Sequence, residues 1–431
     1  MNYQETLEFL FTSAPLFQNI GAGAYKEGLT TTEVFDEHFG HPHRSYRTIH
    51  VGGTNGKGST SHTLASILQS AGYRVGLYTS PHLVDFRERI RVNGEPISEQ
   101  RVIDFVAEER EFFEPHHPSF FELTTALAFK YFEEQKVDIA VIEVGLGGRL
   151  DCTNIIRPIL SIVTNISLDH TQFLGETLGE IAAEKAGIFK KNIPAIVGQS
   201  LPETRPIFEK TAQEVGTPLY FAEDEELILS SSSDQEGNML YSTEKYGMIV
   251  AELSGWCQVK NAATILSTLQ HLPLDIQEKL SPESVRKGFK NIGALTGLLG
   301  RWQKVGTHPT VICDTGHNAD AWEFLALQLE ALACRQLHIV FGASSDKDVQ
   351  KTLRKLPKTA KFYFTQASVQ RALPVAELKL QATEVGLVGN AFQSVREAYV
   401  SALTSASPED AIFVGGSSFV VADFLAQQNA E

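Results

Sequence analysis

The sequence is poor in cysteine, and its few cysteines form no pattern that indicates pairing or metal binding. Among 431 residues there are four, none of them in a CxxC pair: Cys152, Cys257, Cys313 and Cys334. This argues against a disulfide scaffold and a zinc ribbon, and it fits a reducing compartment. No apolar run reaches the roughly 18 residues of a membrane span, and Glu5 and Glu8 lie where a signal peptide carries positive charge. We therefore expect a cytoplasmic protein with no membrane partner.

Positive charge is also scarce. The chain has 37 lysines and arginines against 52 acidic residues, which gives a formal net charge of −15. This excess argues against a protein that coats nucleic acid or an anionic membrane surface, so we expect no nucleic-acid partner. It leaves room for a locally positive pocket that binds a small anion. Hydrophobic residues at 42% and charged residues at 21% are ordinary for a globular protein.

Short β-rich runs alternate with helical patterns along most of the chain. The runs are 47–51, 74–78, 139–144, 159–164 and 195–197, then 310–313, 337–341, 362–365 and 412–414. Such alternation is typical of α/β proteins with parallel sheets. A length of 431 residues, at about 150 per domain, predicts two or three domains, and the glycine-rich, uncharged stretch 291–300 marks one break.

We predict an N-terminal α/β domain with a mostly parallel sheet over residues 1–295. A second, smaller α/β domain is expected over residues 296–431. The serine-rich stretch 230–238 is expected to form an exposed hairpin loop.

The strongest local signal is the glycine-rich segment His50–Thr60, which follows a predicted strand and opens a predicted helix. Glycines let backbone N–H groups converge on phosphate oxygens, and the helix N-terminus adds a positive dipole. Lys57 is expected to reach the outer phosphates of a nucleotide, and Ser59 or Thr60 to hold Mg²⁺. Gly58 separates Lys57 from Ser59, which departs from the common GxxxxGK[ST] spacing. The alternative is a glycine-rich turn that binds nothing.

Further polar residues stand near the ends of predicted strands, where ligands of open α/β sheets bind. They are Ser80, Glu143, Asp169 and His170, with Lys185 at the end of a helix. A carboxylate in an apolar strand is costly unless it is paired or binds a metal, and Mg²⁺ prefers oxygen ligands, so Glu143 predicts a magnesium site. The alternatives are an ion pair of Glu143 with Arg149 or Lys185, and a capping or surface role for His170. Lys185, as an ammonium, is expected to pair with phosphate or carboxylate.

The second predicted domain offers groups for a nucleotide. Arg301 follows the glycine-rich stretch and is expected to contact phosphate, and Asp314 follows a strand, where a carboxylate can accept hydrogen bonds from ribose. The alternatives are an interdomain salt bridge for Arg301 and a helix N-cap role for Asp314 or Asn318.

Taken together, these motifs resemble the folylpolyglutamate synthase/dihydrofolate synthase family of the Mur ligase superfamily of ATP-dependent amide-forming ligases. The motifs run in order along most of the chain: Gly53–Ser59, Ser80–Leu83, Glu143–Asn154, Asp169–His170, Glu184–Ile188, Gly300–Arg301 and Asp314–Asn318. The sequence departs from the family pattern at Cys257, at Thr315–Gly316 and at Ala319. These departures affect the adenine and ribose details and remove no proposed ligand.

The resemblance implies an N-terminal P-loop ATPase-like domain and a smaller, Rossmann-like C-terminal α/β domain. It also implies ATP and two Mg²⁺ ions as cofactors and a role for each matching residue. It implies nucleotide contacts from Thr54, Asn55, Gly56, Lys57, Gly58, Ser59, Asn261, Arg301, Asp314 and His317. It implies metal ligands at Ser59, Ser80, Glu143 and His170, and catalytic roles for Lys57, His170 and Lys185. Lys185 matches a lysine that the family carbamylates with CO₂. His82, Phe121 and Asp151 match the pterin or folate site, where the aromatic ring of Phe121 would stack on the pterin. Plain core packing is the alternative for Phe121.

The implied reaction joins L-glutamate to dihydropteroate, to reduced folates through the γ-carboxylate, or to both, by way of an acyl phosphate. The expected partners are these small molecules, and the expected oligomeric state is a monomer. One alternative is a cell-wall Mur-type ligase, which would need a further domain ahead of the phosphate loop. The other is a catalytically inactive nucleotide-binding homologue, which has less use for Glu143, His170 and Lys185 together.

Overall fold

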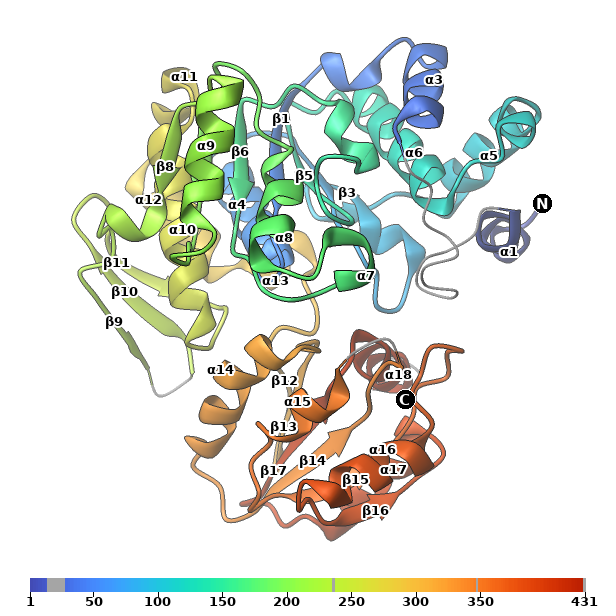
Figure 1. Ribbon diagram of the computed structural model, residues 1–431, viewed down its shortest axis with the longest axis vertical. Coiled ribbons are helices and arrows are strands. Elements are labelled where there is room, and N and C mark those ends of the chain that lie inside the picture. The colour runs from blue at the N-terminus through green and yellow to red at the C-terminus, as the bar shows by residue number, and fades with distance from the viewer. Residues whose placement is uncertain (14–27, 235–236, 346–347, 429–431) are drawn as a thin grey trace. The chain divides into compact units, whose positions relative to one another are not determined.

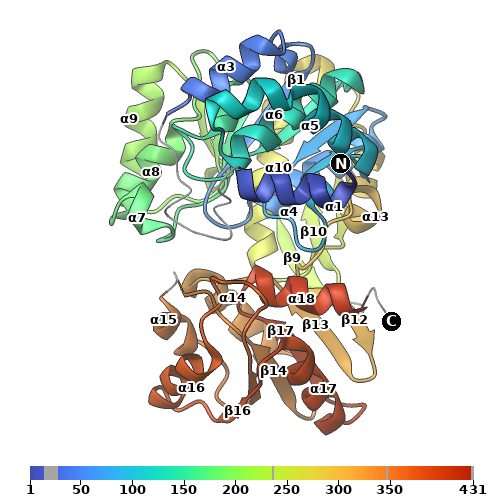
Figure 2. The same ribbon diagram turned by 90° about the vertical axis from the view of Figure 1, so that its right-hand side faces the viewer.

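The computed structural model describes residues 1–13, 28–234, 237–345 and 348–428. They form two compact units. The larger runs to Ser254 and continues over Gln258–Leu298, and the smaller consists of Gly255–Cys257 and the chain from Leu299 onward. Each unit has its own main β-sheet with helices packed against it (Figures 1 and 2). Among the described helices, none combines the length and the apolar character needed to cross a membrane.

The main sheet of the larger unit has eight strands in the order β4-β3-β2-β5-β1-β6-β7-β8. From β2 to β8 in this order all neighbours are parallel, whereas β3 and β4 are antiparallel additions at one edge. All five residues of β5 are buried, which explains the apolar run in the sequence. The strands are β1 (Arg47–Gly52), β2 (Val75–Tyr78), β3 (Ile90–Val92), β4 (Glu95–Pro96), β5 (Ile139–Glu143), β6 (Leu160–Val163), β7 (Ala195–Val197) and β8 (Leu219–Phe221).

Helices cover both faces of this sheet because successive side chains of each strand point to opposite faces. Val141 packs in a cluster with α4 (Lys57–Ser70), α10 (Cys257–His271) and α12 (Pro282–Lys290). Its neighbour Ile142 packs in the cluster on the other face, with α1 (Tyr3–Ser13), α3 (Thr30–His38), α5 (Glu99–Phe113) and α6 (Phe120–Glu134). A third cluster joins β6 and β7 to α8 (Leu178–Ala186) and α9 (Arg205–Val215).

A separate three-stranded antiparallel sheet belongs to the larger unit, in the order β11-β10-β9. It consists of β9 (Ser230–Ser233), β10 (Met239–Thr243) and β11 (Gly247–Ala251). The expectation of a loop over residues 230–238 was wrong for Ser230–Ser233, which pair with β10 as an edge strand. All four serines are exposed, so no alternation of apolar and polar residues marks this strand in the sequence.

The smaller unit contains a six-stranded sheet in the order β12-β13-β17-β14-β15-β16, in which only β12 pairs antiparallel among these strands. Its core includes Trp322, whose ring meets those of Phe341 and Phe413 edge-on. The two sheets confirm the predicted α/β class. The elements are β12 (Gln303–Thr307), β13 (Thr310–Asp314), α14 (Ala319–Glu330), β14 (Leu337–Phe341), α15 (Val349–Leu353), β15 (Lys361–Phe364), α16 (Val375–Glu384), β16 (Gly389–Ala391), α17 (Val395–Ser405), β17 (Ala411–Gly415) and α18 (Ser418–Gln428).

Candidate active site

The predicted site residues of the larger unit follow adjacent parallel strands, so they lie along the edge of the sheet that is formed by the carboxyl ends of these strands. In the register of the sheet, Val51 of β1 lies beside Glu143 of β5, and Gly52 lies beside Val163 of β6. The phosphate loop therefore begins between the ends of β5 and β6. The Ser80 segment follows β2, and the segment with Asp169 and His170 follows β6. This edge is where open parallel sheets bind their ligands.

Two glycines give the phosphate loop its shape. Gly53 has φ +131°, and a Cβ atom there would lie 1.9 Å from Thr164 Oγ1. Gly56 has φ +83° and precedes the first residue of α4, and a Cβ atom there would lie 2.3 Å from Asn261 Oδ1. Both positions combine a left-handed or otherwise restricted backbone with close neighbours, so only glycine fits. The predicted nucleotide residue Asn261 thus lies directly against the loop.

Residues after β6 hold the loop in place. The backbone N–H of Thr54 donates to the carbonyl of Asn165 at 3.0 Å, and that of Asn55 donates to the Asn165 side chain, to Oδ1, at 2.8 Å. The Asn55 side chain donates to Ser167 Oγ at 3.1 Å. Neither Asn165 nor Ser167 was among the residues predicted for the site. Their signal was weak, since it consists only of polar residues that directly follow a buried strand.

The first turn of α4 carries Ser59, whose side chain is buried. Its hydroxyl accepts a hydrogen bond from Gln258 Nε2 at 3.4 Å, and Gln258 Oε1 accepts one from Asn261 Nδ2 at 2.9 Å. Gln258 therefore connects the predicted metal ligand Ser59 to the predicted nucleotide contact Asn261. Gln258 was not predicted from the sequence, because its partner Ser59 on α4 is 199 positions away.

Two lysines meet at the carbonyl oxygen of Gly53. Lys57 Nζ donates to it at 3.1 Å and to the Thr54 carbonyl at 3.1 Å, and Lys185 Nζ donates to the Gly53 oxygen at 2.9 Å. Lys185 is only 5% exposed. Burial, followed by repulsion from Lys57, lowers the pKa of Lys185 to about 7, although nearby carboxylates oppose the shift. A large fraction of the Lys185 side chains is therefore neutral near pH 7.

Glu143 is buried at the carboxyl end of β5, with only 3% of its surface exposed. The sequence offered two cations as its ion-pair partners. Of these, Arg149 donates to Glu184 at 2.8 and 3.0 Å, and Lys185 donates to the Gly53 carbonyl. A buried carboxylate at the edge where the phosphate loop begins is a suitable oxygen ligand for Mg²⁺.

His170 and Ser80 lie on the segments that follow β6 and β2. His170 has a left-handed backbone (φ 50°) and immediately precedes the short helix α7 (Thr171–Leu174). Its backbone N–H donates to Asp169 Oδ1 at 2.8 Å, and its Nε2 atom lies 3.9 Å from Asp169 Oδ2. Ser80 is partly exposed.

The predicted pterin residues His82 and Phe121 lie near β2. His82 Nδ1 accepts a hydrogen bond from Arg89 Nε at 2.7 Å, and burial lowers the pKa of His82 well below its ordinary value. The neutral ring therefore carries its proton on Nε2. Phe121 lies with its ring 5.8 Å from that of Tyr78 and is partly exposed, whereas Phe120 beside it is 2% exposed. The core-packing alternative therefore describes Phe120 better than Phe121.

Asp151 is buried and shapes the loop that follows β5. Its Oδ2 atom accepts the backbone N–H groups of Gly145 at 3.0 Å and Leu146 at 2.8 Å, and Oδ1 accepts that of Thr153 at 3.0 Å. Burial raises the pKa of Asp151, and these hydrogen bonds oppose the shift. Both carboxylate oxygens thus have protein partners.

In the smaller unit, Asp314 at the end of β13 fixes the turn before α14. Its carboxylate accepts the backbone N–H of Trp302 at 2.7 Å and that of Gly316 at 2.8 Å. Burial raises the pKa of Asp314, and the charge of Arg301 opposes this shift. Asn318 caps α14, as the alternative for this residue predicted, and His317 Nδ1 lies 3.1 Å from the Thr315 carbonyl.

Comparisons with known proteins agree with this architecture. The Mur ligase middle domain matches residues 51–268, and the glutamate ligase domain of Mur ligases matches residues 300–418. The Bacillus subtilis dihydrofolate synthase/folylpolyglutamate synthase is 36% identical over 81% of this chain and 84% of that protein. The Lacticaseibacillus casei folylpolyglutamate synthase is 31% identical over 97% of each chain. A Haloferax volcanii relative is 34% identical over 98% of this chain, which spans only 50% of that longer protein.

Solved structures give the same result. Escherichia coli FolC in complex with DHPP and ADP aligns with a TM-score of 0.85 and 32% identity, covering 100% of this chain and 98% of that chain. A Yersinia pestis bifunctional folylpolyglutamate synthase/dihydrofolate synthase complexed with AMPPNP and a Mn ion aligns with a TM-score of 0.82 and 29% identity, with the same coverage. The phosphate loop, the buried strand-end carboxylate and these matches agree, and the chain belongs to the folylpolyglutamate synthase/dihydrofolate synthase family of the Mur ligase superfamily.

Proposed function

We propose that this protein is an ATP-dependent ligase that joins L-glutamate to dihydropteroate, to reduced folates, or to both. The observation that carries the proposal is the convergence of Lys57 and Lys185 on the phosphate loop, beside the strand that ends in buried Glu143. The relatives named above are ligases of this kind, and the matched structures hold DHPP, ADP or AMPPNP. The alternative of a cell-wall Mur-type ligase has no such support.

The phosphate loop is the proposed site for the phosphates of ATP. The backbone of Thr54–Ser59 and the ammonium of Lys57 would bind them, and we assign Asn261, Arg301, Asp314 and His317 to the rest of the nucleotide. The oxygens of Ser59, Ser80 and Glu143 are the donors that Mg²⁺ prefers, and a second ion is proposed at His170. When bound, Mg²⁺ neutralises the charge that develops on the transferred phosphoryl group.

The proposed reaction has two steps and needs no nucleophilic side chain. The substrate carboxylate attacks the γ-phosphorus of ATP, which releases ADP and forms an acyl phosphate. The amine of L-glutamate then attacks the acyl carbon, loses a proton, and expels phosphate as the amide forms. Lys57 and the loop N–H groups stabilise the negative charge of the first step by fixed position and electrostatics.

Lys185 is proposed to react with CO₂. Its neutral amine would attack the carbon of CO₂ and release one proton, which leaves an N-carboxylate on the side chain. The low pKa of Lys185, about 7, supports this step, because only the neutral amine is nucleophilic. The product is an anionic oxygen donor able to support the second metal ion at His170.

The assignment is tested with purified protein, ATP, Mg²⁺ and L-glutamate, with either dihydropteroate or tetrahydrofolate as acceptor. We expect release of ADP that depends on both glutamate and acceptor, and the side-by-side assay decides which acceptors are used. The variant Glu143→Gln should lose at least about a hundredfold in kcat, because a ligand charge is lost where phosphoryl charge develops. Glu134→Gln, an exposed acid paired with Arg101, is the matched control.

Absence of glutamate-dependent ADP release with both acceptors would overturn the folate assignment. Nucleotide binding without turnover would favour the inactive homologue. We also propose a monomer in the cytoplasm, with a domain boundary near residue 295, and light scattering of the purified protein tests the oligomeric state.

A further inference from the structure

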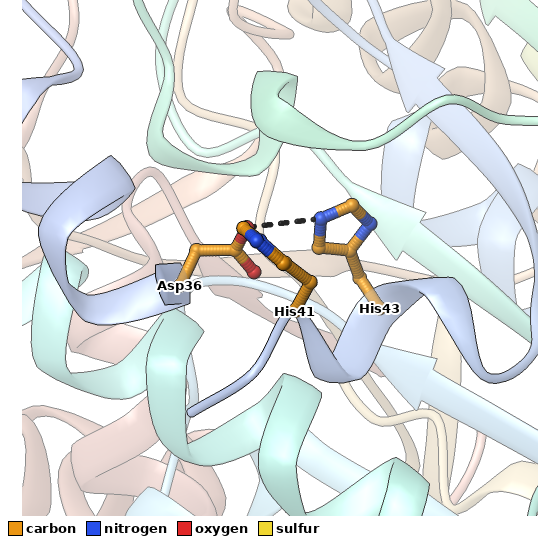
Figure 3. A group of neighbouring side chains, drawn as sticks. All are labelled: Asp36, His41 and His43. Atoms are coloured by element: carbon orange, nitrogen blue, oxygen red, sulfur yellow. Dashed lines mark hydrogen bonds and ion pairs between the residues drawn. The ribbon is translucent and has the colours of Figure 1, made fainter. Parts of the chain in front are cut away.

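Three side chains that commonly bind metal ions converge in the larger unit, on elements that precede the phosphate loop. They are Asp36 on α3, His41 in the following turn, and His43 in the 3₁₀ helix Pro42–Arg44 (Figure 3). His41 Nδ1 lies 2.6 Å from Asp36 Oδ2, and His43 Nε2 lies 3.2 Å from the same oxygen. One ligand atom from each residue lies within 4.8 Å of the other two.

The turn that brings these residues together is built into the sequence. Helix α3 ends with a Schellman motif, in which the N–H of Gly40 donates to the carbonyl of Glu37 and that of His41 donates to the carbonyl of Asp36. Gly40 has φ +71°, which favours glycine, and His41 follows with φ 60°. The motif folds His41 back onto the last turn of α3, next to the Asp36 side chain.

The cluster is buried on one side and open on the other. The side chains of Asp36 and His43 are 9% and 6% exposed, and His43 packs with its ring 5.9 Å from that of Phe129. The side chain of His41 is 35% exposed. The second carboxylate oxygen, Asp36 Oδ1, is buried and has no hydrogen-bond partner among the residues that the structure describes. A buried acceptor in this state has lost its hydration without a replacement. Such a costly group needs an explanation, and a bound cation supplies one.

We propose that Asp36, His41 and His43 form a binding site for a divalent transition-metal ion, best matched by Zn²⁺. Two imidazole nitrogens and one carboxylate suit zinc, whereas Mg²⁺ prefers a ligand set made mostly of oxygens. Tetrahedral bonds of about 2.0–2.1 Å place ligand atoms about 3.3 Å apart. The pair of His43 and Asp36 already has this spacing, at 3.2 Å, and the distance between His41 Nδ1 and Asp36 Oδ2, 2.6 Å, would have to lengthen by less than about 1 Å. Water completes the coordination on the exposed side of His41.

The position of the site indicates a structural role. The ion would tie the end of α3 to the turn that leads directly into β1, which begins at Arg47 and whose other end enters the phosphate loop. The folded state holds the preformed site and the unfolded state does not, so metal binding stabilises the folded state relative to the unfolded state. The proposal does not depend on the activity of the enzyme.

The test uses protein without an affinity tag, stripped of metal by a chelator and free of nucleotide and Mg²⁺. Titration calorimetry with Zn²⁺ should give one tight site per chain, and Co²⁺ at that site should show the visible absorption of a four-coordinate ion. His41→Ala and Asp36→Asn should each weaken Zn²⁺ binding at least tenfold, because each removes a ligand. The control His38→Gln lies on the same helix, pairs with Glu109, and should bind Zn²⁺ as the wild type does.

Thermal unfolding gives a second readout. Zn²⁺ should raise the midpoint of the wild type and of His38→Gln, but not that of the two cluster variants. Because His41 is one-third exposed, His41→Ala is expected to fold, and its circular dichroism spectrum checks this. If both cluster variants bound Zn²⁺ with the affinity and stoichiometry of the wild type, the ion would lie elsewhere and the proposal would be overturned. Absence of any tight site in the wild type would equally overturn it.

Discussion

The low pKa of Lys185 predicts a specific reactivity toward CO₂. With a pKa of about 7, about half of the Lys185 side chains are neutral at pH 7. A lysine with the ordinary value of 10.5 is neutral in roughly one molecule in 3,000. Burial and the charge of Lys57 therefore raise the fraction of reactive amine by roughly 1,500-fold. We expect Lys185 to form a carbamate near neutral pH while exposed lysines remain largely unmodified.

The assay is ¹³C NMR of the protein in buffer equilibrated with ¹³C-labelled CO₂, with dissolved CO₂ held constant from pH 6 to pH 9. One carbamate signal per chain should appear as the pH rises through about 7, the pKa of Lys185. It should be absent from Lys185→Met and unchanged in Lys130→Met, which replaces a partly exposed lysine paired with Glu133. A signal that persists in Lys185→Met, or the absence of a carbamate from the wild type, would refute the reasoning.

Three further predictions follow from the geometry of the larger unit. Gly53→Ala should weaken ATP binding, because its Cβ would collide with a threonine at 1.9 Å. The control Gly72→Ala is also at positive φ but would have nothing within 4 Å of its Cβ, and it should bind ATP as the wild type does. Nucleotide titration of the two variants compares their affinities for ATP. Phe121→Ala should raise the KM for dihydropteroate with little loss of stability, whereas Phe120→Ala should cost about 3–5 kcal/mol in urea unfolding. In CO₂-free buffer between pH 7 and pH 10.5, Lys185 is protonated in the unfolded state but largely neutral in the folded state. The free energy of unfolding of the wild type should therefore rise with pH, relative to that of Lys185→Met, by up to about 1.4 kcal/mol per pH unit. Parallel pH profiles of the two proteins would contradict the last prediction.

The sequence predicted those features that are encoded locally. The phosphate loop is a contiguous segment between a strand and a helix, and its glycines are required by backbone angles and close neighbours at Gly53 and Gly56. Glu143 stood out because it places a carboxylate at the end of an otherwise apolar strand. The common edge of the sheet followed from a rule of parallel sheets, in which neighbouring strands end on the same side.

Features that depend on pairing between distant segments were not predicted. Asn165 and Gln258 contact the loop and α4 across more than a hundred positions, and nothing in a single sequence indicates which distant amide faces which hydroxyl. The strand Ser230–Ser233 lacks an apolar face, so its pairing left no pattern. The three residues Asp36, His41 and His43 are close in sequence, but their convergence depends on the left-handed turn at Gly40.

Lys57 and Lys185 bring two basic side chains to the phosphate loop of a chain whose net charge is −15. Both Nζ atoms donate to the Gly53 oxygen, at 3.1 and 2.9 Å, so they are at most about 6 Å apart. At that separation and an effective dielectric constant of about 20, two ammonium charges repel by about 3 kcal/mol. The proposed conversion of Lys185 to a carbamate would replace this repulsion with an attraction of similar size, because the charge at that position would change sign. Repulsion between the two ammonium ions therefore favours the neutral amine of Lys185, from which the proposed carbamate would form, and we expect Lys57 to keep its positive charge for the phosphates of ATP.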